Sequence, residues 1–559
     1  MRTLLGRLFL LSGVAFAAFG ADSKLATDLH HLDPSSSIDV IIQYRQAPAA
    51  AHHRKVVVRG GQLKRELSII KAAHYSVPAS ALADLANDPD VVAITPDREV
   101  NGFLDLTAQA VNANLAWRAF GVNGNNIGVA VIDSGISLAG DLSEGQVVYS
   151  QSFVGGDAND RYGHGQHVAG IIASDGEASQ CWNCFRTFKG IAPGANLINL
   201  RVLDPSGSGS DSNVIAAIQT AINLRFRYNI RAINLSLGRP IFESYKLDPL
   251  CQAVEAAWKA GIVVVVAAGN SGRDNTFNTQ GYGTITAPGN DPYVITVGAM
   301  KTEGTAGRFD DDIASYSAKG PTAIDHIVKP DLVAPGNRVV SLLSPDGVLQ
   351  KQFPGNKTVL GYFEWGLSNA NAAMVSNNYF TLSGTSMAAP VVSGAVALLL
   401  DQNANLTPDQ IKARLMKTAY KNFPSSSVAV DPATNISYTS YYDIFTVGAG
   451  YLDVYAALSN GDRVTGTALS PSATFSKSTG RVSLILPNGV VWGDGVVWGD
   501  GVVWGDSSVS SSGVVWGTGV VWGTGSMILG TGVVWGDSVV WGKGKPTGEA
   551  TNIAIMGEQ

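Results

Sequence analysis

Four short segments of this 559-residue chain carry, in order, an acid, a base, an amide and a hydroxyl. The segments read IDSG, GHGQHVAG, AAGN and SGTSMAAP, and they contribute Asp133, His164, Asn270 and Ser386. A serine hydroxyl becomes a competent nucleophile when a histidine takes its proton, and a carboxylate must hold that histidine in one tautomer. The oxyanion formed by attack on a carbonyl needs fixed hydrogen-bond donors, and an amide can be one of them. Together the four residue types predict amide-bond hydrolysis by a serine nucleophile.

The acid and the base lie where the sequence changes from a strand pattern to a helix pattern. Asp133 ends the apolar run 128–132, which is typical of a buried strand that leads into a turn. His164 stands between two glycines, which let substrate and backbone approach the ring closely. Small residues follow and favour a closely packed helix. His167, three residues later, is a second candidate base.

The amide and the nucleophile also occupy element ends. Asn270 follows the apolar run 261–269, which indicates a central parallel strand. Ser386 precedes a long apolar helical pattern, so its hydroxyl and its backbone N–H are expected at the positive end of a helix dipole. Taken alone, each has an ordinary interpretation, as a loop asparagine and a serine near a helix cap. The nine-residue match LSGTSMAAP, at 382–390, makes chance a poor explanation for the serine.

These segments closely resemble those of the subtilisin-like serine proteases, peptidase family S8, over roughly Leu104 to Leu458. The order Asp, His, Ser is the order found in subtilisin. The resemblance implies that Asp133 orients His164, that His164 rather than His167 is the base, and that Asn270 and the Ser386 N–H hold the oxyanion. Gln166 departs from the family, which usually has Thr there, and is expected to change local packing only.

The resemblance also extends to the expected substrate pocket and so to protein or peptide substrates. The residues it assigns to that pocket are Ser236, Leu237, Gly238, Ala267, Ala268 and Gly269. Since no acid stands among them, a preference for basic side chains is not expected. We expect a broad preference for an apolar or medium-sized side chain before the scissile bond.

Charge and hydropathy narrow the class of protein further. A net charge of −6 and a pI near 5.8 argue against nucleic acid as a partner, which would require a basic face. Residues 1–20 are typical of a secretory signal, with an N-terminal membrane anchor as the alternative. No later run of about 20 apolar residues predicts a membrane span. The mature protein is therefore expected to be secreted, either free, periplasmic or held at the cell surface.

Strand and helix patterns alternate over residues 106–460, which predicts an α/β fold. Strands are expected at Ile127–Ile132, Leu197–Val202, Ala232–Leu237, Ile262–Ala268 and Tyr293–Val297, and helices at Ser212–Tyr228, Leu250–Ala260, Thr385–Gln402 and Pro408–Ala419. Such alternation predicts a mostly parallel central sheet covered on both faces, the three-layer fold of subtilisin. Active residues then lie at the carboxyl ends of strands.

Residues 21–105 predict a small α+β domain. Strands are expected at Ile38–Tyr44, Val56–Val58 and Val91–Ile94, with helices at Gly61–Ala73 and Ala79–Ala86. This pattern resembles the ferredoxin-like propeptide of subtilases, which assists folding and then inhibits the protease from within the same chain. The resemblance implies that the zymogen cuts itself near Val100–Leu106. An unrelated N-terminal domain is the alternative.

The three cysteines and the acidic loops raise two further questions. Cys181 and Cys184 predict a local disulfide with Cys251 left free, although pairing of Cys251 with one of them stays open. No cofactor is needed for the chemistry and no metal site is predicted. Structural calcium is a hypothesis by family analogy only, with Asp157, Asp160 and Asp310–Asp312 as candidate ligands, and a solvated acidic loop is the alternative.

Beyond the protease-like region the chain becomes repetitive. Residues 461–487 predict a linker with a strand at Val482–Leu486. Residues 488–545 repeat the unit GVVWGD, and residues 546–559 follow the repeats. Within the protease-like region, residues 353–378 predict an inserted surface segment. An even repeat places the tryptophans on one face of an extended strand, or one repeat forms one rung of a β-solenoid. Such a row of tryptophans could bind glycans or self-associate. The alternative is a glycine-rich tail that is partly disordered or is removed during maturation. The competing function is a surface-binding or assembly protein built on a protease scaffold.

Overall fold

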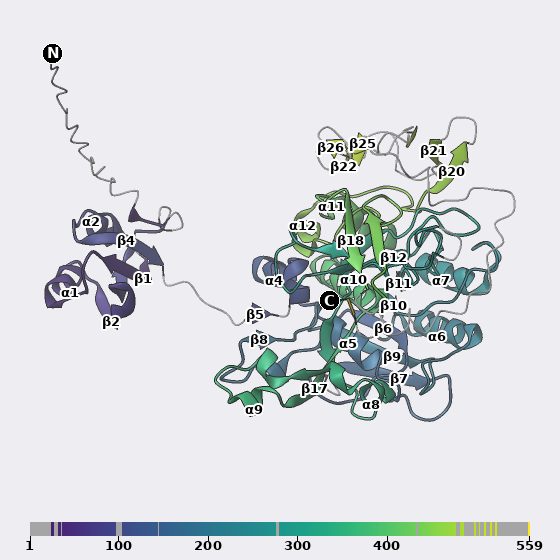
Figure 1. Ribbon diagram of the computed structural model, residues 1–559, viewed down its shortest axis with the longest axis horizontal. Coiled ribbons are helices and arrows are strands. Elements are labelled where there is room, and N and C mark those ends of the chain that lie inside the picture. Colours follow the sequence, from purple (N-terminus) through teal and green to yellow (C-terminus); the bar gives the residue numbers. More distant parts are fainter. Residues whose placement is uncertain are drawn as a thin grey trace, which may run out of the picture. The chain divides into compact units, whose positions relative to one another are not determined.

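The computed structural model divides into two compact units, a small unit of residues 1–101 and a large unit of residues 102–559 (Figure 1). It describes residues 24–96, 103–104, 106–476, 481–485 and 557–558, and five residue pairs between 497 and 521, with short gaps at 27–28, 30–31, 35, 143–144, 276–278 and 432–433. The expected signal segment, residues 1–20, lies outside the described residues.

The small unit is one antiparallel sheet with two helices. Its elements are β1 (Ser37–Tyr44), α1 (Ala50–Val57), β2 (Gln62–Leu67), β3 (Ala72–Pro78), α2 (Leu82–Ala86) and β4 (Val91–Pro96). The strands lie in the order β2-β3-β1-β4. Val40, Ile42, Tyr75 and Ile94 are fully buried and form its core.

Two sequence-based assignments in this unit were wrong. The expected strand at Val56–Val58 is the end of α1, and the expected helix at Gly61–Ala73 is β2 and the start of β3. The QLKREL segment of β2 contains strong helix formers and is almost wholly exposed. Pairing with β3 therefore overrides its intrinsic preference, as tertiary context often does.

The large unit is built on an eight-stranded sheet, and the predicted parallel strands are confirmed. Its strands are β6 (Gly128–Asp133), β7 (Val147–Ser152), β9 (Asn196–Arg201), β10 (Ile230–Leu235), β11 (Val263–Ala267), β12 (Ile295–Lys301), β13 (Asp312–Ile313) and β14 (Leu332–Pro335). The order is β13-β12-β11-β10-β6-β9-β7, with β14 beside β12, and only the β12–β13 pair is antiparallel.

Helices cover both faces of this sheet, since every residue of β6, β11 and β12 is buried. The main helices are α5 (Gly165–Ala173), α6 (Asp211–Leu224), α7 (Pro249–Lys259), α10 (Thr385–Gln402) and α11 (Pro408–Thr418). Helices α5 and α10 pack against each other and the sheet, and so do α6 and α7. Among the described helices, α10 is long and apolar enough to cross a membrane, but 83% of that stretch is buried, so it is a core helix.

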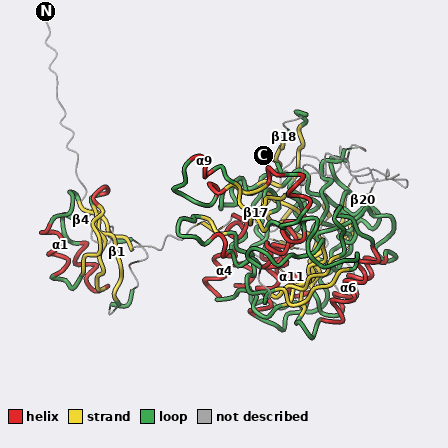
Figure 2. The backbone as a smooth tube through the Cα atoms, turned by 90° about the horizontal axis from the view of Figure 1, so that it is seen from below, coloured by secondary structure: helices red, strands yellow, loops and turns green. Residues whose placement is uncertain are grey.

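Shorter elements complete the large unit (Figure 2). They are β5 (Phe103–Leu104), α3 (Leu106–Ala110), α4 (Ala113–Phe120), β8 (Arg186–Thr187), β15 (Val339–Leu342), α8 (Val348–Gln352), β16 (Lys357–Val359), α9 (Asn369–Ala372), β17 (Val375–Leu382), β18 (Ser426–Val430), β19 (Ser437–Tyr441), α12 (Val454–Ser459), β20 (Ser472–Ser476) and β21 (Arg481–Ile485). The predicted linker is thus partly a hairpin. Ala473 and Val482 of that hairpin are buried beside Phe445.

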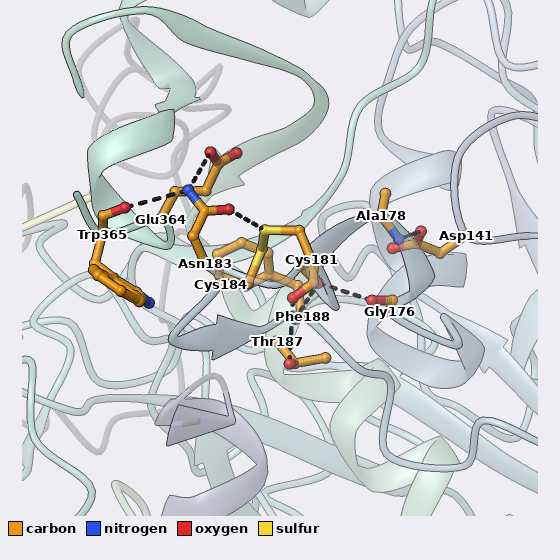
Figure 3. The surroundings of a disulfide bond; sticks show 11 residues. Asp141, Gly176, Ala178, Cys181, Asn183, Cys184, Thr187, Phe188, Glu364 and Trp365 are labelled. Atoms are coloured by element: carbon orange, nitrogen blue, oxygen red, sulfur yellow. Dashed lines mark hydrogen bonds between the residues drawn. A yellow bond between two sulfur atoms is a disulfide. The ribbon is translucent and has the colours of Figure 1, made fainter. Parts of the chain in front are cut away.

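The predicted disulfide is present and closes the loop before β8, which lies beside the 353–378 segment (Figure 3). Cys181 and Cys184 are bonded, while Cys251 is a free, buried thiol whose pKa is raised by burial. The backbone N–H of Trp365 donates to the backbone carbonyl of Asn183 at 2.9 Å. The side-chain amide of Asn183 donates to the backbone carbonyl of Trp365 at 3.2 Å. The 353–378 segment therefore contacts the disulfide loop directly.

The repeat tail is described only at short strand pairs. β22 (Val497–Trp498) pairs antiparallel with β23 (Val502–Val503), β25 (Val515–Trp516) pairs with β26 (Val520–Val521), and β24 (Ser508–Val509) pairs with β21. The tryptophan row and the solenoid hypothesis otherwise fall on residues outside the described part of the chain.

Candidate active site

The carboxyl ends of β6, β10 and β11 meet at one edge of the sheet, where such folds bind ligands. Asp133 is the last residue of β6 and is fully buried. Its Oδ1 accepts the Ser134 N–H at 2.7 Å and lies 2.8 Å from His164 Nδ1. Because a carboxylate only accepts, Nδ1 must carry the imidazole proton. His164 Nε2 is thereby left unprotonated in the neutral ring and can act as a base.

A second buried carboxylate holds the loop that carries His164. Asp160 accepts the N–H groups of Tyr162, Gly163 and Gln166 at 3.0, 2.7 and 2.8 Å, and the Ser134 hydroxyl at 2.8 Å. The Ser134 hydroxyl in turn accepts the Gly165 N–H at 2.8 Å. Sequence reasoning offered Asp160 only as a calcium candidate and missed this positioning role, because its partners come from two separate segments.

Of the remaining calcium candidates, Asp157, Asp310 and Asp312 have protein partners. Asp157 forms an ion pair with Arg161 at 2.8 Å, and Asp312 accepts the Tyr442 hydroxyl at 2.9 Å. The described residues contain no group of three or more His, Cys, Asp or Glu side chains arranged to hold a metal ion. Structural calcium therefore stays a hypothesis by family analogy.

Gln166, the departure from the family pattern, is buried with both ends of its amide satisfied. Its Oε1 accepts the Ser137 N–H at 2.8 Å, and its Nε2 donates to the Ala139 carbonyl at 3.3 Å. The longer side chain thus ties α5 to the loop after β6. It does not displace His164 from Asp133.

The two histidines of GHGQHVAG are in different electrostatic situations. Burial acts to lower the pKa of His164, but the charge of Asp133, its hydrogen bond and the charge of Asp160 prevail and raise that pKa above 6.5. Burial, reinforced by the charge of His164, lowers the pKa of His167 to about 3. His167 Nε2 lies 3.1 Å from the Val339 carbonyl and 3.0 Å from the Phe380 carbonyl, so it is committed to β15 and β17.

Activity is expected to rise with pH and level off above the pKa of His164. Only the neutral imidazole can take the Ser386 proton, and Asp133 stabilises the charged form. The kcat/KM for a peptide substrate, measured against pH, should therefore show a midpoint above 6.5. Asp133→Asn should move that midpoint to lower pH. An activity that falls as pH rises through this range would contradict the assignment.

Ser386 lies at the second position of α10, as the sequence predicted. Its hydroxyl donates to the Ser236 carbonyl at 3.2 Å. Pro390 has no N–H to donate to the Ser386 carbonyl one turn earlier, and the Ser236 hydroxyl supplies that hydrogen bond instead, at 2.7 Å. Ser393 binds Asn234 at 2.8 Å, so two contacts fix α10 against β10. Helix α10 also packs on α5, whose N-cap residue is His164.

Asn270 is oriented by the residue that precedes the nucleophile. Its Oδ1 accepts the Thr385 N–H at 2.9 Å and the Thr385 hydroxyl at 3.1 Å. These bonds fix which end of the amide is the acceptor, so Nδ2 is presented as a donor. Gly384, at φ 140°, leaves this donor uncovered, because a Cβ there would lie 3.2 Å from Nδ2. The arrangement suits stabilisation of an oxyanion.

Asn270→Ala is expected to lower kcat about 100- to 1,000-fold with little change in KM, the size of loss measured for the oxyanion amide of subtilisin. Asn270→Asp is the matched variant, because it keeps the acceptor for Thr385 but replaces the donor with a charged oxygen that repels the oxyanion, so its loss should be at least as large. Both variants should be measured by steady-state kinetics on a peptide substrate. A loss below tenfold in both would remove Asn270 from the reaction.

The six expected pocket residues divide into buried and accessible groups. Ser236, Ala267 and Ala268 are buried, while Leu237 and Gly269 are half-buried and Gly238 is exposed. Thr286, which the sequence did not single out, lies against both glycines: added Cβ atoms at Gly238 and Gly269 would come within 2.5 and 3.0 Å of its side chain. No acid stands among the six residues.

Comparison with known proteins decides the family. The chain matches the model described as "Subtilase family" (Peptidase_S8) over residues 124–443. It is 36% identical over 367 residues to serine protease AprX of Bacillus subtilis, covering 63% of this chain and 75% of that protein. This chain belongs to the subtilase family. It is 31% identical over 389 residues to subtilisin E of the same species (68% and 84% covered), and 32% identical over 374 residues to the extracellular serine proteinase of a Thermus strain (65% and 74%).

Membership confirms two expectations drawn from the motifs. The chain is a subtilisin-like serine peptidase, and its peptidase region has the α/β architecture expected from strand–helix alternation. The matched residues 124–443 contain Asp133, His164, Asn270 and Ser386. A serine protease acts on peptide bonds, so its substrates are proteins or peptides.

Proposed function

We propose that this subtilase is a secreted endopeptidase, made as a self-processed zymogen, in which Asp133, His164 and Ser386 form the catalytic triad. The observation that carries the proposal is the 2.8 Å contact between Asp133 Oδ1 and His164 Nδ1. This contact leaves Nε2 free to accept a proton. Asn270 and Ser386 stand at the neighbouring strand and helix ends.

In this mechanism Ser386 Oγ attacks the peptide carbonyl while His164 Nε2 takes its proton. Asn270 Nδ2 and the Ser386 N–H stabilise the oxyanion, and the imidazolium faces the charge of Asp133. His164 then gives the proton to the leaving amine, and water hydrolyses the acyl-enzyme by the same steps in reverse. Asp133 keeps the ring in one tautomer throughout.

The side chain before the scissile bond is proposed to be apolar or medium-sized. Leu237, Gly238 and Gly269 are accessible at the ends of β10 and β11, and none of them carries charge. Thr286 contributes a small hydroxyl between the two glycines. This combination offers no partner for a basic side chain.

The small unit is proposed to be the inhibitory propeptide. It is a separate compact unit with the β-α-β-β-α-β order of ferredoxin-like folds, and it ends at Asn101, inside the region where self-cleavage is expected. On the far side of that boundary, Phe103–Leu104 pairs with Arg186–Thr187 in β8. The start of the mature chain would therefore be fixed to the large unit.

Secretion is supported by the signal-like residues 1–20 and by the Cys181–Cys184 disulfide, which fits an oxidising compartment. The repeat tail keeps its sequence-based hypotheses of glycan binding or self-association. A pull-down of the full Ser386→Ala chain on insoluble polysaccharide, compared with a chain lacking residues 488–545, tests the first of these.

The zymogen proposal is tested by intact mass and N-terminal sequencing of the wild type and of Ser386→Ala. The wild type should lose residues up to about Val100–Leu106, and the variant should keep them. Mass lost from the other end would identify the repeats as a maturation segment. If both folded proteins keep the small unit, the self-processing proposal is wrong.

A further inference from the structure

The last described residues of the chain, Gly557 and Glu558, are seated in the large unit. The side chain of Glu558 is 4% exposed. Burial of a carboxylate is costly unless it is paired and hydrogen-bonded. The residues around Glu558 must therefore supply positive charge and hydrogen-bond donors to its carboxylate.

Four residues form a cradle around Glu558: Arg273, Lys301, Ser315 and Asn337. Arg273 Nη2 donates to Oε1 at 2.8 Å, and the Ser315 N–H donates to the same oxygen at 3.0 Å. The Ser315 hydroxyl also donates to Oε1, and Lys301 Nζ lies 3.9 Å from Oε2. The carboxylate thus meets two cations and two donors.

Asn337 recognises the backbone of the same residue. Its Nδ2 donates to the Glu558 carbonyl at 3.0 Å, and its Oδ1 accepts the Glu558 N–H at 2.9 Å. Gly557 has φ 79°, and an added Cβ would lie 2.5 Å from Ser383 Oγ and 2.6 Å from Arg338 Cγ. The cradle therefore selects a glycine followed by an acidic residue.

The cradle is built on the segments that carry the proposed active site. Arg273 follows Asn270 by three residues, and Ser383 precedes Ser386 by three. The Gly336 carbonyl, next to Asn337, accepts the Gly384 N–H at 2.8 Å. The end of the chain therefore lies against the loop that leads into the nucleophile.

We propose that Gly557–Glu558 is a latch that holds the C-terminal end of the repeat tail on the peptidase unit through this carboxylate cradle. The tail is then attached at both ends, covalently after β21 and non-covalently at Glu558. A single cut within the repeats would leave the C-terminal piece bound. Release would need loss of the latch contacts as well as the cut.

The test uses the full chain carrying Ser386→Ala, so that self-cleavage does not interfere, with a recognition site for a specific external protease inserted between Ser511 and Ser512. After cutting, gel filtration at low salt should show the fragment that begins at Ser512 co-eluting with the large unit. A synthetic peptide of residues 550–559, added in excess, should displace the fragment.

Glu558→Gln is expected to speed dissociation of the fragment roughly 10- to 100-fold, since a hydrogen bond to a charged group contributes about 1.5–3 kcal/mol. Glu549→Gln is the matched control, because it removes the other acidic side chain in this part of the sequence, and it should dissociate like the parent. Asn337→Ala, on the cradle side, should also speed release. Equal thermal midpoints of the uncut chains exclude a folding defect in the variants.

Two results would overturn the latch. Immediate release of the fragment from the parent would show that the cradle holds nothing once the tail is cut. Equal retention in the parent and in Glu558→Gln, without displacement by the peptide, would show that other tail residues hold the fragment. Neither result bears on the catalytic proposal, because every chain in this test lacks Ser386.

Discussion

Ser386→Ala is expected to lower kcat about 10⁶-fold on a peptide substrate, the size of loss measured when the nucleophile of subtilisin is removed. The substitution removes the Oγ that forms the acyl-enzyme, and no other described contact of α10 depends on that oxygen except the 3.2 Å bond to the Ser236 carbonyl. The fold should therefore persist. Active-site titration with an acylating inhibitor, alongside steady-state kinetics, measures both the loss of turnover and the loss of the nucleophile.

Ser393→Ala is the matched control on the same helix. Ser393 is buried and donates to Asn234 Oδ1 at 2.8 Å, so its removal costs stability, about 1–3 kcal/mol for an acceptor left without its donor. It should leave kcat within a few-fold of the parent. A Ser386→Ala protein that remains folded and still digests casein at the parental rate would refute the assignment.

The sequence predicted elements well where the signal is local. The start of α11 was predicted from Thr407, Pro408 and Gln410, and the structure contains the full capping box there. The apolar runs at 128–132 and 261–269 predicted central strands, and they contain the buried strands β6 and β11. Helix α10 begins and ends at the residues predicted for it.

The features that sequence reasoning missed depend on contacts between distant segments. The Asp160 carboxylate accepts the Ser134 hydroxyl. The Ser236 hydroxyl donates to the Ser386 carbonyl, 150 residues away in sequence, and Arg273 donates to the Glu558 carboxylate, 285 residues away. β2 was assigned to a helix because its residues favour one and its strand partner lies elsewhere. One clue was readable: Pro390, four residues after Ser386, leaves a carbonyl that needs another donor.

His164 and His167 should respond to substitution in opposite ways. His164→Ala is expected to lower kcat about 10⁶-fold, as removal of the corresponding base does in subtilisin, and it should also cost stability because buried Asp133 loses the N–H that it accepts. His167→Gln should keep kcat within about tenfold and lower the free energy of unfolding by about 1–3 kcal/mol, since His167 Nε2 serves the buried Val339 and Phe380 carbonyls.

The pH profile separates the two roles further. The residual activity of His164→Ala should lose the rise with pH that His164 confers, whereas His167→Gln should keep a midpoint above 6.5, because the pKa of His164 is raised chiefly by Asp133 against the effect of burial. Neutral His167 takes no part in that rise. If His167→Gln abolished turnover in a folded protein while His164→Ala retained it, the base would be the second histidine, and the contact between Asp133 and His164 would be structural.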